Sequence, residues 1–182
     1  MSLIAFFGAL ESGLIYGLVA LGVLISFQTL DFPDLTADGS FPLGGAVAGV
    51  SIVAGVNPWL ACAFGMLAGS VAGVVTAWLH VKLGILQLLA SILVMVALYS
   101  VNLRIMGAPN LPLLGETTVF SSLVTNDNGF WMRCLIIGAV VILAKLFLDW
   151  FYSTESGLSM RATGSNLRMA QAQGINTSWM TI

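Results

Sequence analysis

Residues 59–81 read WLACAFGMLAGSVAGVVTAWLHV, an apolar run without an aspartate, glutamate, lysine or arginine. A helix needs about 20 such residues to cross the ~30 Å hydrocarbon core of a bilayer, so the run predicts a membrane-spanning helix. Small residues recur in it at every fourth position: Ala61, Gly65, Gly69, Gly73 and Ala77. They share one helix face, where a second backbone can approach closely in lipid. We therefore expect Gly65, Gly69 and Gly73 to be helix-packing positions.

Similar apolar runs lie on either side, at residues 3–27, 41–56, 83–103 and 130–151. None shows the alternating pattern of a membrane β-barrel, and only helices and closed barrels can span a bilayer. The composition agrees, since 58% of the residues are hydrophobic and 8% are charged, against about a quarter charged in soluble domains. The sequence predicts an all-α fold: a polytopic membrane helix bundle of about five transmembrane helices, with residues 1–182 in a single domain.

The charged residues limit the kinds of partner. The net charge is −2, and the six lysines and arginines form no patch that could neutralise the phosphates of a nucleic acid. Membrane lipid is the expected surrounding, and no metal site is expected, because the single histidine has no second ligand at helical spacing. If residues 152–178 are cytoplasmic, the basic residues on or near the inner side are Lys82, Lys145, Arg161 and Arg168, and those outside are Arg104 and Arg133. This excess on the inner side agrees with the positive-inside rule.

A polar break, DFPDLTADGSFP at residues 31–42, separates the first two apolar runs. Ser40 is a suitable N-cap for the helix that follows, with Pro42 in its first turn. One interpretation is a gap between half-helices whose groups face a solute pathway, and the other is a solvated loop. The carboxylates that would face the pathway are Asp31, Asp34 and Asp38.

The run at residues 83–103 carries a polar stripe formed by Gln87, Ser91 and Asn102. At 100° per residue these positions lie within about 60° of one another. Polar groups at membrane depth usually face a bundle interior or a wet cavity, which makes the three residues candidates for the solute pathway. Hydrogen bonding between helices is the other interpretation.

The most polar stretch, ESGLSMRATGSNLRMAQAQGI at residues 155–175, follows the last apolar run. Ser165 is expected to cap a helix over residues 166–173, and Gly174 occupies the position of a left-handed C-cap. A helix of about two turns is not stable alone, so it should dock on something. Its apolar face consists of Leu167, Met169 and Ala170. This face is small for membrane binding, so a protein partner is favoured over a lipid surface.

These residues resemble a known family. The pattern Gly157, Met160-Arg161-Ala162, Asn166, Ala170 and Gly174-Ile175 is similar to the cytoplasmic coupling motif of ABC importer permeases of the branched-chain amino acid and ribose permease superfamily. The run GLIYGLVALG at residues 13–22 supports this resemblance. The break LDFPDLTADGSFPLG at residues 30–44 is similar to a less characterised branch associated with aromatic amino acids.

The resemblance implies the permease subunit of a binding-protein-dependent importer in the bacterial inner membrane, forming the pathway for an amino acid or similar small polar solute. It implies a separate ATPase subunit, an extracytoplasmic solute-binding protein received by residues 104–129, and a second permease copy, so that the permease is a homodimer or a pseudo-dimer. Residues 153–178 become the cytoplasmic coupling segment. Coupling to the ATPase is expected at Arg161, Asn166, Leu167, Ala170 and Gly174. Family members continue past this segment, so the chain resembles a C-terminally truncated member, either a fragment or the product of a truncated gene.

Two other function classes compete with the importer. An ATP-independent secondary transporter or channel fits the composition equally well but has no need of the motif at residues 157–175. A membrane enzyme would use the carboxylates of residues 31–38, which have no accompanying base or metal ligand, so no enzymatic activity is expected. The chain lacks a Gly-x-x-x-x-Gly-Lys-Ser/Thr motif, so it should carry no cofactor, with ATP bound on the partner subunit.

Overall fold

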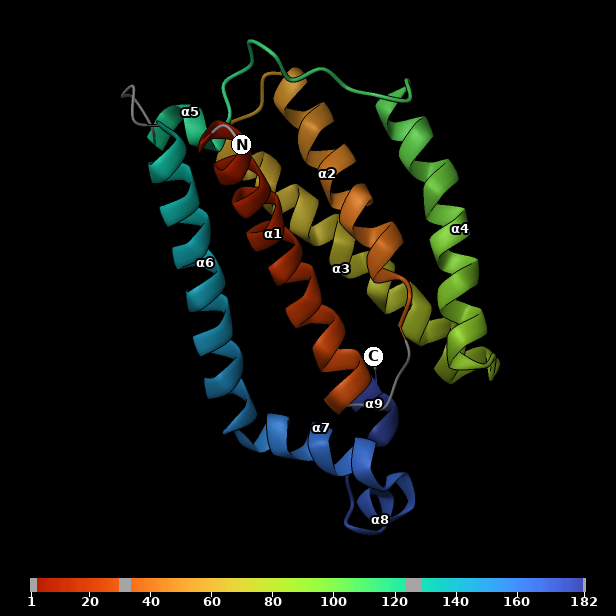
Figure 1. The fold of residues 1–182 in the computed structure, drawn as a ribbon. Coiled ribbons are helices and arrows are strands. Elements are labelled where there is room, and N and C mark those ends of the chain that lie inside the picture. Colours follow the sequence, from red (N-terminus) through yellow and green to blue (C-terminus); the bar gives the residue numbers. More distant parts are fainter. Residues whose placement is uncertain (1–2, 30–33, 124–128, 182) are drawn as a thin grey trace. The chain divides into compact units, whose positions relative to one another are not determined.

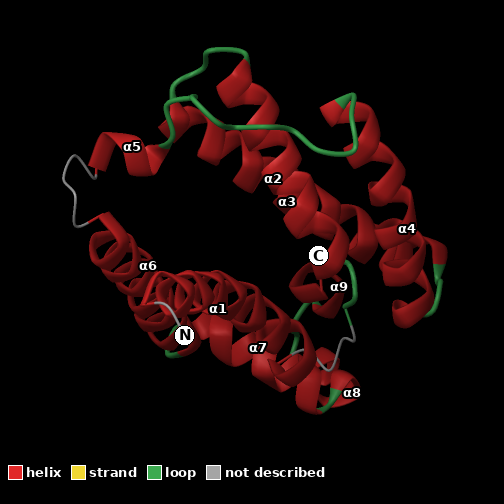
Figure 2. Cartoon of the chain, turned by 45° about the horizontal axis from the view of Figure 1, so that its top comes forward, coloured by secondary structure: helices red, strands yellow, loops and turns green. Residues whose placement is uncertain are grey.

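The computed structural model describes residues 3–29, 34–123 and 129–181, and it shows helices joined by loops throughout them (Figures 1 and 2). Each of the five apolar runs forms a helix, so the predicted all-α fold is confirmed. These helices are α1 (Leu3–Leu24), continued by a π-helical turn η1 (Ile25–Thr29), then α2 (Ala37–Val53), α3 (Pro58–Leu83), α4 (Gln87–Met106) and α6 (Gly129–Tyr152). Shorter helices are α5 (Val119–Leu123), α7 (Glu155–Ser165), α8 (Leu167–Ala172) and α9 (Thr177–Thr181).

Within the described residues, four helices are long and apolar enough to cross a membrane: α1, α3, α4 and α6. Helix α2 is also apolar but has 17 residues, which makes it shorter than these spans. Large apolar side chains lie exposed along the spans, for example Leu143 and Phe147 on α6. Such surfaces are stable in lipid and not in water. The helices form two compact units, one containing α2, α3 and α4 and the other containing α1, η1, α6, α7 and α8.

The small-residue face of α3 packs on α2 within their unit. A Cβ atom built on Gly65 would lie 2.7 Å from the carbonyl oxygen of Gly44 on α2. The corresponding atom on Gly69 would lie 3.7 Å from the carbonyl oxygen of Ser40. Gly73 has no such described neighbour within 4 Å. The close approach of the two backbones is therefore concentrated at Gly65.

Helix α2 begins at Ala37, earlier than predicted, so Ser40 is not its N-cap and Pro42 lies beyond its first turn. The Asp34 carboxylate accepts a hydrogen bond from the Thr36 N–H at 2.8 Å, and the Thr36 hydroxyl pairs with the Thr76 hydroxyl of α3 at 2.8 Å. Both side chains of that pair are buried. These bonds set the start of the helix ahead of Ser40, whose hydroxyl instead donates to the carbonyl of Ala37.

Helices α1 and α6 lie side by side and run in the same direction in the other unit (Figure 1). Near their beginnings the Phe7 and Trp131 rings are 4.2 Å apart, and the Cys134 thiol donates to the Phe7 carbonyl. At their ends the Thr29 and Tyr152 hydroxyls are 2.7 Å apart. The two helices are therefore parallel neighbours over their whole length.

Candidate functional site

Helix α8 ends the polar segment that the sequence singled out, but its cap differs from the prediction. Asn166 is the N-cap, because its side-chain oxygen accepts from the Met169 N–H at 3.0 Å. Ser165 belongs to the end of α7, and its hydroxyl donates to the Ala162 carbonyl instead. Asn166 is able to cap because its backbone is extended, with φ −158°, which breaks the chain between α7 and α8.

Helix α8 is exposed at every position except Ala170. Leu167 and Met169 are 52% and 62% exposed, whereas Ala170 is 3% exposed. Gly174 follows the helix with φ +82°, a conformation that glycine adopts without strain, and its N–H donates to the Gln171 carbonyl at 3.0 Å. The helix thus exposes two large apolar side chains, and Ala170 is its buried contact point.

Helix α7 was not predicted as a helix. Its sequence, ESGLSMRATGS, has no apolar periodicity and includes two glycines, which lower helix propensity. The available signal was Thr154, which follows the last apolar run and caps α7 by accepting from the Gly157 N–H. Arg161, expected at the ATPase contact, lies on α7 with its guanidinium carbon 4.6 Å from the centroid of the Tyr152 ring.

The start of α2 packs against α3 and α4 at positions within these helices, away from their ends. Thr76, the partner of Thr36, precedes the end of α3 by about 10 Å at the helical rise of 1.5 Å per residue. Gly39 lies against Met95 and Leu98, in the middle of α4. The half-buried Asp34 and the exposed Asp38 flank this start. Asp31, the third predicted pathway carboxylate, lies outside the described residues.

The polar stripe of α4 divides into two parts. Gln87 is half-buried, and its side-chain nitrogen lies 3.5 Å from Nε2 of His80, whose Nδ1 is 2.7 Å from the carbonyl oxygen of Ile85. Ser91 is fully buried and donates its hydroxyl to the Leu88 carbonyl. Asn102 is 5% exposed, and its Oδ1 atom has no hydrogen-bond partner among the described residues. The stripe therefore contains a buried polar atom whose bonding capacity the described part of the chain leaves unused.

We expect Asn102→Leu to leave the free energy of unfolding unchanged or to raise it. A buried amide oxygen without a partner costs about 1–3 kcal/mol, and leucine has a similar size without that cost. Thermal unfolding in detergent measures the effect, with Ser91→Ala as a control that removes a satisfied hydroxyl and should lower stability slightly. A clear loss of stability in Asn102→Leu would contradict the unpaired state.

Helices of membrane length with lipid-exposed apolar faces define a multi-pass membrane protein. The family model of the branched-chain amino acid transport system permease component matches residues 5–182. The chain belongs to this family, and it is a transport permease component. The family resemblance predicted from the coupling motif is therefore confirmed.

Relatives of this chain are found in bacteria and in an archaeon. A "Tyrosine transport system permease protein" of Clostridioides difficile is 40% identical over 92% of this chain and 54% of the relative. An uncharacterized protein of Rickettsia prowazekii is 35% identical over 87% of this chain and 54% of the relative. A "Probable branched-chain amino acid transport permease protein" of Methanocaldococcus jannaschii is 27% identical over 92% of this chain and 58% of the relative.

The chain spans about half the length of these curated relatives. The tyrosine permease is consistent with the branch associated with aromatic amino acids. No solved structure matches the chain.

Proposed function

We propose that this chain forms the solute pathway of a binding-protein-dependent ABC importer and that α8 receives a separate ATPase subunit. The proposal is carried by one observation, the exposure of Leu167 and Met169 on a capped helix outside the apolar spans. Exposed apolar side chains on a short helix are suited to burial in a hydrophobic groove on a protein. ATP would bind only on the partner subunit, and this chain would have no enzymatic activity of its own.

An amino acid is the proposed solute, and an aromatic one is favoured by the 40% identity to a relative named for tyrosine transport. The start of α2 is the proposed pathway position, with Asp34 and Asp38 as carboxylates for the ammonium group of the solute. Helix starts carry a positive partial charge, which suits the carboxylate end of an amino acid. Asp31, Gln87, Ser91 and Asn102 remain predicted pathway residues.

The proposed assembly contains a second permease copy and an extracytoplasmic solute-binding protein, in a bacterial inner membrane. The stretch between α4 and α5 would help to receive the binding protein, because most of it is exposed, Leu114 most strongly. It lies at the end of α4 that carries Arg104. Lys82 lies at the end of α3, next to the other end of α4.

The docking proposal predicts loss of the ATPase when α8 loses its apolar side chains. Leu167→Ser and Met169→Ser should each reduce co-purification of the ATPase from detergent by about tenfold, since a buried interface leucine or methionine contributes roughly 1.5–3 kcal/mol. Gly174→Val should act in the same direction, because valine is strained at φ +82° and would reshape the end of α8. Gly174→Val is also expected to uncouple ATP hydrolysis from the uptake of labelled tyrosine.

Met132→Ser is the matched control for Met169→Ser. Met132 is 51% exposed but lies at the beginning of α6, a full helix length from the α7 junction. Its substitution should leave the ATPase bound. An ATPase that stays with the α8 variants would reject docking on α8, and uptake that persists without any ATPase would favour a secondary transporter or channel.

A further inference from the structure

The end of α6 contacts two other elements of the same unit through a single side chain, that of Tyr152. The Tyr152 hydroxyl is 2.7 Å from the hydroxyl of Thr29, which is the last residue of η1. Thr29 is 7% exposed and Tyr152 is half-buried, so this bond is partly shielded from water. The two residues are separated by 123 positions in the sequence. The bond therefore joins the end of the first span to the end of the last one in this unit.

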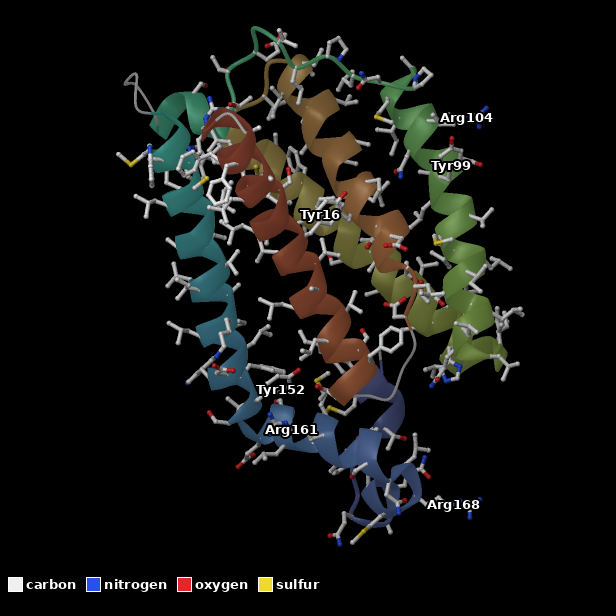
Figure 3. All side chains as sticks on the ribbon, viewed as in Figure 1. Tyr16, Tyr99, Arg104, Tyr152, Arg161 and Arg168 are labelled. Atoms are coloured by element: carbon white, nitrogen blue, oxygen red, sulfur yellow. The ribbon has the colours of Figure 1, made fainter. Side chains whose placement is uncertain are left out.

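The ring of the same tyrosine contacts α7. The Arg161 guanidinium carbon lies 4.6 Å from the ring centroid, a distance at which a cation is attracted by the aromatic face. Figure 3 shows Tyr152 and Arg161 next to each other where α6 meets α7. Arg161 is exposed and stays a predicted ATPase contact, and its contact with the Tyr152 ring also links α7 to the end of α6. Tyr152 thus has its hydroxyl on η1 and its ring on α7.

The backbone at this junction allows little relative movement of α6 and α7. Gly157 is buried, and a Cβ atom built on it would lie 2.6 Å from Cα of Tyr152. The Thr154 hydroxyl donates to the Phe151 carbonyl and its oxygen accepts from the Gly157 N–H. Because α7 is held this closely, a displacement of α7 must carry the end of α6 with it.

The segment η1 is the element at this junction that is suited to change shape. It is π-helical over Ile25–Thr29, whereas the preceding residues of α1 are α-helical. π-Helical turns are rare and occur frequently at functional sites. Contacts connect η1 to both α1 and α7. The Thr29–Tyr152 bond therefore holds the last residue of the turn against the same tyrosine that α7 contacts.

We propose that Tyr152 is a positioning residue that transmits the movement of α7 and α8 to the π-helical end of α1. This inference rests on the proposed function, because the movement would come from the ATPase docked on α8. The Arg161 contact and the Gly157 packing tie α7 to the tyrosine, and the tyrosine hydroxyl ties η1 to both. Breaking the hydroxyl bond weakens this link between η1 and α7 without removing any part of α8.

Tyr152→Phe tests the proposal in the intact transporter, reconstituted in liposomes with its ATPase and binding protein. The variant keeps the ring and its contact with Arg161 and loses only the hydroxyl. We expect the number of ATP molecules hydrolysed per tyrosine transported to rise by about three- to tenfold, the factor that one lost hydrogen bond gives. ATPase co-purification should remain at the wild-type level, because α8 is unaltered. Tyr99→Phe is the matched control, since Tyr99 is exposed on α4.

A double-mutant cycle isolates the bond itself. Thr29→Val has the shape of threonine without the hydroxyl, so it should raise the coupling ratio as Tyr152→Phe does, and the double variant should be no worse than either single one. Thr29→Ser retains a hydroxyl and should restore coupling. Arg161→Lys keeps a cation over the Tyr152 ring, so it should hydrolyse less ATP per tyrosine transported than Arg161→Ala does. Arg133→Ala is the control for a lost charge, because Arg133 is exposed.

The possible outcomes are distinct. A wild-type coupling ratio in Tyr152→Phe, or additive effects in the cycle, would overturn the role of the hydroxyl. Lost ATPase binding or a lowered melting temperature in Tyr152→Phe would also overturn it, because the hydroxyl would then be structural. Uptake by the wild-type transporter that does not require ATP would instead reject the proposed importer, and this inference with it.

Discussion

Gly157→Ala is expected to reduce ATP-dependent uptake by more than tenfold, although it adds a single methyl group. The added carbon would lie 2.6 Å from Cα of Tyr152 and 3.1 Å from the carbonyl carbon of Phe151, with the oxygen of Phe151 also in contact. Backbone atoms cannot move aside as a flexible side chain can, so α7 must move away from α6. Overpacking of this kind costs about 1–3 kcal/mol. The movement would also separate Arg161 from the Tyr152 ring.

The measurement is the initial rate of uptake in proteoliposomes, together with the melting temperature in detergent. Gly138→Ala is the control, because its added carbon would meet the Leu14 side chain at 3.9 Å, an ordinary contact. This substitution lies inside α6 and should stabilise the helix by up to about 1 kcal/mol. Wild-type uptake and stability in Gly157→Ala would show that α7 is not held against α6 as described.

Gly65→Ala should lower the free energy of unfolding by about 1–3 kcal/mol, because the added carbon would lie 2.7 Å from the Gly44 carbonyl oxygen. The Ala48 side chain, at 3.3 Å, leaves little room on the other side. Helices α2 and α3 would have to separate, and the close approach that small residues permit in lipid would be lost. Thermal unfolding in detergent measures the change.

Gly73→Ala is the matched control, on the same helix and in the same series of small residues. No described atom outside its own helix turn and chain neighbours lies within 4 Å of the added carbon, so alanine should stabilise α3 by up to about 1 kcal/mol. The two variants are thus expected to change stability in opposite directions. Equal effects at both glycines would reject a specific α2–α3 contact at Gly65.

Hydrophobicity was sufficient to predict the spans. An uncharged apolar run of about 20 residues has one stable conformation in lipid, so the helices α1, α3, α4 and α6 could be predicted with small errors at their ends. The predicted start of α2 was wrong because the observed start depends on the Thr36–Thr76 bond, which joins residues 40 positions apart. The sequence around Ser40 contains a good local cap, and a tertiary contact overrides it.

The polar end of the chain was harder to predict. The short helix after Asn166 could be found from its composition and from Gly174, but both Ser165 and Asn166 are good caps and only the backbone decides between them. Helix α7 has too little propensity to be recognised, since it is stabilised by its contacts with α6, η1 and α8. The partnership of Thr29 with Tyr152 has no local signal, because neither neighbourhood contains a motif for it.

The parallel packing of α1 and α6 fixes how the chain is threaded through the bilayer. Two parallel spans enter from the same face, so the chain between them must cross the membrane an odd number of times. Helices α3 and α4, joined by the turn at Gly84, account for two crossings. The third falls to α2, despite its 17-residue length. The beginning of α1 therefore lies on the face opposite to α7 and α8, so it is extracytoplasmic if α8 meets an ATPase.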